Sequence, residues 1–412
     1  MSENNFVAKI GLDWADKKHD FCLLENGRSK CEYGTFLHTP ATIEEWVLNL
    51  YLWFNGQSVA ICLELKSGPI VSCLQKFGFI TLFFVPLKEL AKYRDIFCQS
   101  GAKDDPTDAY LQLNYLMTHP ETLREVTVDD ENTRIIQRLT EHRKFFVEEQ
   151  VAQSERIRAG LKAYYPLVLE LFNDLNTIVF CDFLKRWPNL TELKKARECT
   201  LVEFLKSHNS GQRGLLERRL NLIKEAVALT EDVAIIIPAQ LYTLSLIKQL
   251  KVLLETIKEY DKEIECWFNK HKDKELFESL PGAGKVLAPR LLAAFGADRS
   301  RFANANELID YAGISPVTFR SGEKYWIHWR FKCSTFIRQT FVEWAYQTTK
   351  ASYWSKAFYD KNRSQGKSHQ ATLRLLAFKW IRIIFRCWKN NTKYDEATYM
   401  FALNRRHSEI EN

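Results

Sequence analysis

The sequence predicts an α/β fold at the amino end of the chain, followed by mainly helical structure. In the first hundred residues, short runs of β-branched and aromatic residues alternate with helical segments, whereas from about Asp105 the apolar residues recur at helical spacing. A chain of 412 residues is long enough for two or three domains. We expect a first domain at 1–130, a helical, coiled-coil region at 131–272, a further domain at 273–400 and a tail at 401–412.

The first domain is expected to begin with three strands, FVAKIGLDW, HDFCLLE and KCEYGTF. The last two are joined at Asn26-Gly27, a strong hairpin signal. A helix is expected from Thr42, because Thr42 and Glu45 have capping-box spacing before an apolar run. SVAICLEL and FITLFFV follow as strands, with a short helix between them. Three hairpin-linked strands, a helix, and then strands separated by helices is the order of an RNase H-like fold, although other α/β folds share it.

The region from Asp105 to His271 is expected to be helical. Its clearest signal is an apolar seam with alternating spacings of four and three residues over three heptads: Leu246, Leu250, Leu253, Ile257, Tyr260, Ile264 and Trp267. Such a seam needs a partner helix, either segment 131–163 of the same chain or a second copy. The prolines in segment 166–240 indicate shorter helices there.

Positive charge is concentrated near the carboxyl end. Residues 281–393 contain 20 Lys/Arg and 6 Asp/Glu, a local excess of +14 in a chain whose net charge is +7. Six of the eleven tryptophans lie in the same stretch. Cations among aromatic side chains are typical of proteins that bind nucleic acids. A solvated basic surface over a Trp-rich core explains the composition equally well.

Several classes of protein are not favoured. The ten cysteines include no CxxC pair, which argues against a zinc ribbon and a disulfide framework. No uninterrupted apolar run reaches the roughly 20 residues of a membrane span, and the first residues do not resemble an export signal. We therefore expect a cytoplasmic protein that does not act at a membrane.

Acidic residues at strand and helix ends suggest a metal site. Asp13 ends the first strand and Glu64 ends SVAICLEL, while Asp105 and Asp108 lie three residues apart in KDDPTD. By itself that last segment is better explained as a helix start, with an Asp N-cap and Pro at the first position. The first two acids, however, would emerge at one edge of an RNase H-like sheet, and Lys103 precedes the acidic pair. The conjunction favours a site for Mg²⁺ or Mn²⁺.

A serine in the basic region is a candidate nucleophile. Ser321 precedes Gly322 and is surrounded by cationic and histidine side chains: Arg320, Lys324, His328, Arg330 and Lys332. A serine that attacks a phosphodiester needs a proton acceptor, which His328 could provide, and cations that stabilise the transition state. A Ser-Gly pair is more often only a turn. Ser315 is a competitor, but Pro316 beside it indicates a turn there too.

The segment LPGAGKVLAPRLLAAFG fits a helix-hairpin-helix turn. Backbone amides at Gly282 and Gly284, beside a helix N-terminus and Lys285, can hold a DNA phosphate without reading its sequence. Glycine-rich turns between helices are common, so the pattern alone is weak.

Taken together, these segments resemble the DEDD-type insertion-sequence transposases (the IS-one-ten family), relatives of the Piv site-specific DNA invertases. IGLDWADKKHD, CLELKSG and AKDDPTDA are similar to the family's acidic motifs, and LPGAGKVLAPRLLAAFG, FANANELIDYAGISP and RSGEKYWIHWR to its carboxy-terminal transposase domain. One departure is Asp104, where the family more often has a neutral residue.

The resemblance implies a RuvC-like DEDD metal site formed by Asp13, Glu64, Asp105 and Asp108, and a covalent protein–DNA intermediate at Ser321. It also implies a homo-oligomer, dimer or tetramer, in which one subunit completes the serine site of another. Donor and target DNA would be selected by a bridge RNA, in a bacterial, nucleoid-associated setting. Two alternatives remain: a metal-dependent RuvC-like nuclease in which Ser321 is structural, and a nucleic-acid-binding protein without catalysis.

Overall fold

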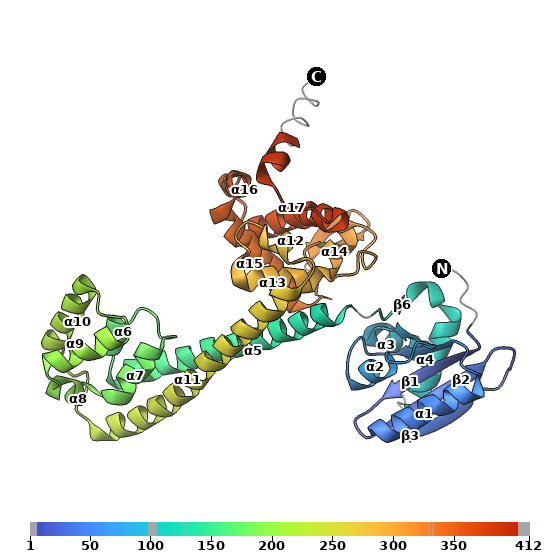
Figure 1. The fold of residues 1–412 in the computed structure, drawn as a ribbon, viewed down its shortest axis with the longest axis horizontal. Coiled ribbons are helices and arrows are strands. Elements are labelled where there is room, and N and C mark those ends of the chain that lie inside the picture. Colours follow the sequence, from blue (N-terminus) through green and yellow to red (C-terminus); the bar gives the residue numbers. More distant parts are fainter. Residues whose placement is uncertain (1–5, 98–104, 128, 329, 332, 403–412) are drawn as a thin grey trace. The chain divides into compact units, whose positions relative to one another are not determined.

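The computed structural model describes residues 6–97, 105–127, 129–328, 330–331 and 333–402 (Figure 1). The chain divides into two compact units, Met1–Val128 and Asp129–Asn412.

The first unit is built on a six-stranded mixed sheet of order β3-β2-β1-β4-β5-β6. Strands β1, β2 and β3 are antiparallel neighbours, β1, β4 and β5 are parallel, and β6 returns antiparallel to β5. The strands are β1 (Ala8–Trp14), β2 (Lys18–Glu25), β3 (Glu32–Leu37), β4 (Val59–Leu63), β5 (Ile80–Phe84) and β6 (Arg124–Glu125). The five longer strands occupy the segments that the sequence predicts, whereas the short β6 was not expected.

Helices cover both faces of this sheet. Helices α1 (Pro40–Trp53) and α2 (Pro69–Leu74) pack with the face that carries Ile10, and α3 (Leu87–Phe97) and α4 (Asp105–Thr118) pack with the other. A single 3₁₀ turn, η1 (Pro120–Thr122), follows α4. Both faces therefore contribute apolar side chains to helix-covered cores, as a sheet buried on both sides requires.

The first helix begins two residues earlier than expected. Thr39, not Thr42, is the N-cap of α1, and its hydroxyl accepts a hydrogen bond from the Thr42 amide at 3.3 Å. Pro40 takes the first helical position, where its missing N–H costs nothing. The expected capping box at Thr42 and Glu45 is therefore wrong.

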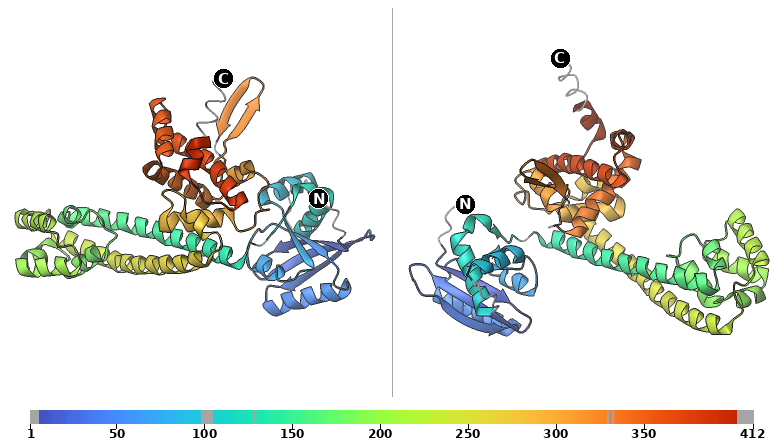
Figure 2. Two further views of the ribbon diagram at one scale, coloured as in Figure 1. Left: turned by 45° about the horizontal axis from the view of Figure 1, so that its top comes forward. Right: turned by 180° about the vertical axis from the view of Figure 1, so that it is seen from behind.

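Two long helices, α5 (Glu131–Tyr164) and α11 (Val233–Lys270), run side by side in the second unit (Figures 1 and 2). Three contacts give their direction: Thr133 with His271, Arg143 with Asp261, and Gln153 with Gln249. The residue number rises along one helix as it falls along the other, so the pair is antiparallel. The apolar seam of α11 thus has a partner in its own chain, in the segment that the sequence suggested.

The distal end of the helix pair carries five short helices around a core of their own. These are α6 (Leu167–Leu171), α7 (Ile178–Arg186), α8 (Leu190–Lys195), α9 (Glu198–Ser207) and α10 (Arg213–Glu225). The expectation of short helices is correct up to residue 225. It is wrong beyond Val233, because α11 continues through Pro238, which lies inside the helix.

By length and composition, one helix among the described residues, α11, is apolar enough to cross a membrane. Its apolar residues are interrupted by polar ones such as Gln240 and Lys248, so they form no uninterrupted apolar run. Leu246, Ile247 and Leu250 of this helix are nevertheless buried in the core shared with α5 and α7, as in a core helix of a globular protein.

The rest of the second unit is a helical body with one β-hairpin. Its helices are α12 (Lys274–Glu278), α13 (Gly284–Phe295), α14 (Ala305–Tyr311), α15 (Thr335–Ala351), α16 (Tyr353–Ser364) and α17 (His369–Asn390). Trp344, Trp354, Trp380 and Trp388 are buried in its core. Four of the six tryptophans in the basic stretch therefore belong to a buried core, as the alternative explanation of the composition predicts. Strands β7 (Val317–Ser321) and β8 (Lys324–His328) form a hairpin that projects from this body (Figure 2).

Candidate catalytic sites

Strand register places Asp13 and Glu64 at the same level of neighbouring strands. Gly11 of β1 pairs with Cys62 of β4 in parallel register, and Asp13 and Glu64 each follow two residues later. Neighbouring strands are about 4.8 Å apart. Both acids are half-buried. The sequence-based expectation that they emerge together at one edge of the sheet therefore agrees with the strand pairing.

Helix α4 crosses the same face of the sheet in direct contact with β1. Gly11 makes this possible, because a Cβ atom at this position would lie 1.9 Å from the Ala109 carbonyl oxygen and 2.5 Å from the Leu113 nitrogen. The Leu12 amide donates a buried hydrogen bond of 3.1 Å to Oε1 of Gln112, which fixes the helix further. Strand alternation puts Asp13 on the same side as Gly11, so this face also carries the acids.

Asp108, next to Ala109 on α4, is buried with a cationic partner. The Arg94 side chain of α3 donates from Nε to Oδ1 of Asp108 at 2.8 Å, and its Nη2 approaches the same oxygen at 2.5 Å. Asp108 is only 3% exposed, so the guanidinium compensates a charge that burial would otherwise disfavour. Asp105 begins α4, but its side chain, like all of Lys103, lies outside the described residues.

A further acid, Asp20, faces the same region and was not singled out from the sequence. It pairs directly with Asp13 across the antiparallel β1–β2 ladder, so the two side chains share one face. Asp20 is 4% exposed and forms an ion pair of 3.0 Å with Lys18. Asp20 could have been identified from the sequence, because an acid seven residues after Asp13 can lie opposite it when a tight hairpin joins the two strands.

The acidic residues are thus gathered on one face, but not yet in the geometry of a metal centre. Within the described ranges, no group of three or more His, Cys, Asp or Glu side chains is placed to hold an ion. The side chain of Asp105, the other predicted ligand on α4, lies outside the described residues.

In the second unit, Ser321 ends strand β7 at the tip of the projecting hairpin. It pairs with Lys324, and the two-residue turn between them has Gly322 at φ +59°. A left-handed first turn residue is typical of a type II′ hairpin, which strongly favours glycine there. Both Ser321 and Lys324 are exposed.

One face of the hairpin carries the serine together with cationic and aromatic side chains. Alternation along paired strands puts Phe319, Ser321, Lys324, Trp326 and His328 on this face. The rings of Phe319 and Trp326 are nearly parallel, with centroids 6.5 Å apart, and are 51% and 41% exposed. This face is therefore accessible to a partner whose flat groups can stack on the aromatic rings and whose negative charge the lysine can neutralise.

The remaining residues predicted around the serine take different places. His328 pairs with Val317 at the opposite end of the hairpin, about 13 Å along the strand from Lys324. This position does not support its role as the direct proton acceptor of Ser321. Arg320 lies on the other face, and Arg330 ties the hairpin base to Asp310 at 3.0 Å. Lys332 is not among the described residues.

The glycine-rich turn before α13 is partly a packing device. A Cβ at Gly282 (φ +71°) would lie 2.8 Å from the Gln347 backbone, whereas Gly284 (φ +53°) faces open space. Helix α13 begins without a side-chain cap or an acid in its first turn. Backbone amides at such an end suit an anion.

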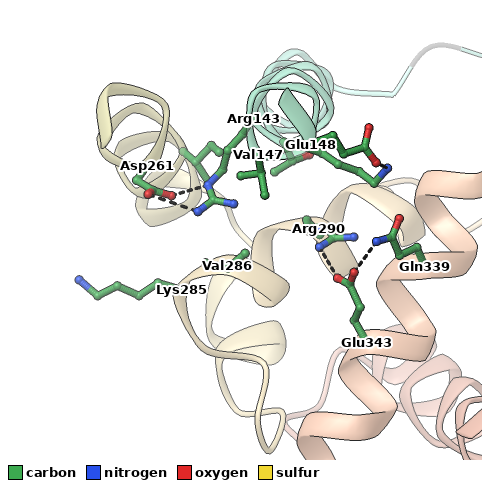
Figure 3. Close-up of a pocket in the computed structure, with 12 residues that line it drawn as sticks. Arg143, Val147, Glu148, Asp261, Lys285, Val286, Arg290, Gln339 and Glu343 are labelled. Atoms are coloured by element: carbon green, nitrogen blue, oxygen red, sulfur yellow. Dashed lines mark hydrogen bonds and ion pairs between the residues drawn. The ribbon is translucent and has the colours of Figure 1, made fainter. Parts of the chain in front are cut away.

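Lys285 lines a small cavity of about 250 Å³ between α5, α11, α13 and α15 (Figure 3). Its amine is 2.7 Å from Glu265, which raises the pKa of the lysine. The other cations of this cavity are likewise paired with acids: Arg143 with Asp261, Lys144 with Glu148 and Arg290 with Glu343. The cavity therefore offers little uncompensated positive charge.

Comparison with known proteins assigns both units to transposase families. Residues 10–166 match a family of DEDD transposases of IS110 type, described as "Transposase". Residues 274–360 match a second family, described as "Transposase IS116/IS110/IS902 family".

Three curated relatives agree with this assignment. The mini-circle putative transposase for IS117 of Streptomyces coelicolor is 26% identical over 408 residues, covering 96% of this chain and 97% of that protein. An uncharacterized 43.6 kDa protein of insertion element IS110 from the same organism is 25% identical over 319 residues, 76% of each chain. The putative transposase y4uE of Sinorhizobium fredii is 28% identical over 201 residues, 48% of this chain and 56% of that protein. The chain belongs to the IS110-type family of insertion-sequence transposases.

Proposed function

We propose that this transposase cuts and rejoins DNA with two chemical centres, a divalent-metal site on the α4 face of the first unit and a nucleophilic serine, Ser321, in the second. The observation that carries the proposal is the convergence of Asp13, Glu64 and the start of α4 on one face, in a chain whose other unit presents Ser321 on an exposed hairpin. The strand order also supports a RuvC/RNase H-like fold for the first unit.

The acids fit Mg²⁺ or Mn²⁺ by their chemistry. Asp13, Glu64, Asp105 and Asp108 would hold the ion through carboxylate oxygens, the ligands that these hard cations prefer. Arg94 contacts Oδ1 of Asp108 through both Nε and Nη2, and these contacts would orient the carboxylate. A bound ion would polarise a phosphodiester oxygen and neutralise charge in the transition state.

Ser321 would form the covalent link to DNA. Its Oγ attacks phosphorus and gives up a proton, the bond from phosphorus to the leaving sugar oxygen breaks, and that oxygen takes a proton. The product is a serine phosphodiester that a second DNA hydroxyl can reverse, which conserves the bond for rejoining. Lys324, directly opposite Ser321, would stabilise the charge that develops on the phosphoryl oxygens.

An adduct assay tests the serine. With cognate DNA, and any RNA the reaction requires, the wild-type protein should give a species on denaturing gels that migrates as protein plus strand. Ser321→Ala should abolish both this species and recombination. Ser315→Ala is the matched control and should retain both, because Ser315 lies half-buried at the hairpin base, where its carbonyl accepts from Arg330. His328→Ala should slow the reaction at most.

A metal-dependent nuclease without serine chemistry is the second candidate. It is favoured by the turn geometry, because a type II′ hairpin already explains the Ser321-Gly322 pair. Recombination by Ser321→Ala would overturn the serine mechanism, whereas Mg²⁺-dependent cleavage that leaves free DNA ends and no protein–DNA adduct would support this alternative. In either mechanism, Asp13→Asn should fold normally and lose Mg²⁺-dependent cleavage, and full activity of that variant would contradict the metal site.

We also propose that the enzyme acts as a homo-oligomer on donor and target DNA selected by a bridge RNA. The local charge of +14 in residues 281–393 supports a polyanionic partner. Protein purified from cells that carry the whole element should retain one discrete structured RNA, and its binding should weaken steeply with salt. Sequencing that recovers only random host fragments would contradict guidance, though not recombination.

A further inference from the structure

A hollow at the corner between α15 and α16 combines aromatic and cationic side chains. It is an open depression of about 740 Å³. Its walls include Tyr346 and Lys350 from α15, and Tyr353, Lys356 and Tyr359 from α16. None of the described side chains that line it is acidic, although Lys356 pairs with the neighbouring Asp360 at 2.8 Å. The hollow therefore differs from the charge-balanced cavity beside Lys285.

The tyrosines form a fixed wall and an exposed platform. The rings of Tyr346 and Tyr359 both contact His369 edge-on, with centroids 5.8 Å apart, and the Tyr359 hydroxyl lies 2.7 Å from Nδ1 of that histidine. These contacts hold the two rings in place. Tyr353, the first residue of α16, is 81% exposed. An aromatic ring so exposed beside a hollow is available for stacking.

The lysines provide positive charge beside these rings. Nζ of Lys350 lies 4.5 Å from the centroid of the Tyr346 ring, in a cation–π contact. Lys356 lies one helical turn after Tyr353, on the same face of α16. Flat aromatic faces with adjacent ammonium groups match the two components of an unpaired nucleotide, its base and its phosphate.

We propose that this hollow binds unpaired nucleotides of a nucleic-acid strand, with a base stacked on Tyr353 and the adjacent phosphates near Lys350 and Lys356. A paired base inside a duplex does not expose its face, so the site selects single-stranded segments over duplex. The inference goes beyond the cutting chemistry proposed above and does not depend on it.

Fluorescence anisotropy with the full-length protein tests the proposal. The probes are fluorescein-labelled, unstructured 12-nucleotide strands, oligo(dT) and oligo(U), and a duplex of equal length. Tyr353→Ala should weaken binding of the single strands by about 5- to 150-fold, the range for loss of one base–aromatic stack. Tyr353→Phe keeps the ring and should bind like wild type. Lys350→Gln should lower the slope of log affinity against log salt by about 0.7, the value for one phosphate contact on a single strand.

Tyr242→Ala is the matched control, because Tyr242 is an exposed tyrosine (52%) on another helix of the same unit, α11. It should bind both single strands like wild type. If Tyr353→Ala weakens binding of oligo(U) alone, the bound strand is RNA, and if it weakens binding of oligo(dT) alone, the strand is DNA. Either result supports the site. Three results would overturn it: Tyr353→Ala within twofold of wild type, an equal loss in Tyr242→Ala, or an equal loss with the duplex. The Ser321 adduct assay is a separate readout, so failure of one proposal does not imply failure of the other.

Discussion

Replacing Gly11 with alanine should impair the proposed metal site without changing any of its acids. The added Cβ would stand 1.9 Å from the Ala109 carbonyl oxygen, and contacts of a Cβ below 3.0 Å are essentially never found in proteins. Helix α4 must therefore move away from β1 by at least about 1.1 Å, and Asp108, the residue before Ala109, moves with it. A displacement of about 1 Å in a catalytic constellation can cost about 100-fold in rate. We expect a loss of this order in Mg²⁺-dependent strand cleavage, with a destabilisation of about 1–3 kcal/mol from overpacking.

Gly78→Ala is the matched control, because Gly78 lies in the same unit with no atom within 4 Å of an added Cβ and no left-handed backbone. Both variants should be assayed for cleavage well below their melting temperatures, which circular dichroism measures. Gly78→Ala should cleave like wild type. Cleavage by Gly11→Ala within threefold of wild type would refute the reasoning, because the close contact of α4 with β1 would then not position the acids.

Two further predictions concern stability and assembly. His19 is fully buried, and burial, with a smaller contribution from His38, lowers its pKa to about 4, so the unfolded chain takes up a proton at higher pH than the native one. The unfolding free energy should therefore fall by about 3 kcal/mol as the pH drops from about 6.5 to 4. Chemical denaturation at several pH values should show a smaller fall for His19→Asn than for the wild-type protein. An equal fall of the unfolding free energy in both proteins would contradict this prediction. The outer face of α11 exposes Ile237 (60%) and Leu241 (68%), which we expect to contact a second subunit. The double variant Ile237→Lys, Leu241→Lys should lower the mass found by light scattering with no change in helicity, and an unchanged mass would place the interface elsewhere.

The sequence predicted the sheet well because its signals are local. Each of the five longer strands is a short run of β-branched and aromatic residues bounded by turn residues, and the level of Asp13 and Glu64 follows from two adjacent parallel strands. The apolar seam of α11 identified a helix pair, but periodicity alone cannot distinguish a partner in the same chain from one in another copy. The antiparallel contacts with α5 supplied that answer.

Features that depend on contacts distant in sequence were not predictable. The role of Gly11 becomes visible only when α4, about a hundred residues later, is placed against β1. The pairing of Asp108 with Arg94 is likewise tertiary, because it joins two helices. The β7–β8 hairpin was hidden in a segment of mixed cations and aromatic residues, and its register separates His328 from Ser321. A list of neighbouring residues therefore suggested a proton acceptor that the strand geometry does not support.

The hairpin that carries Ser321 has a consequence for when the proposed cleavage can take place. It consists of two strands with exposed side chains on both faces, and a two-stranded ribbon of this kind is only marginally stable alone in water. Its exposed aromatic face gains most by being covered. The proposed nucleophile thus lies on an element whose exposed side chains receive little support from the core of the body it projects from. Docking of substrate or of another subunit would order that element, so that readiness to cut is linked to having the correct assembly in place.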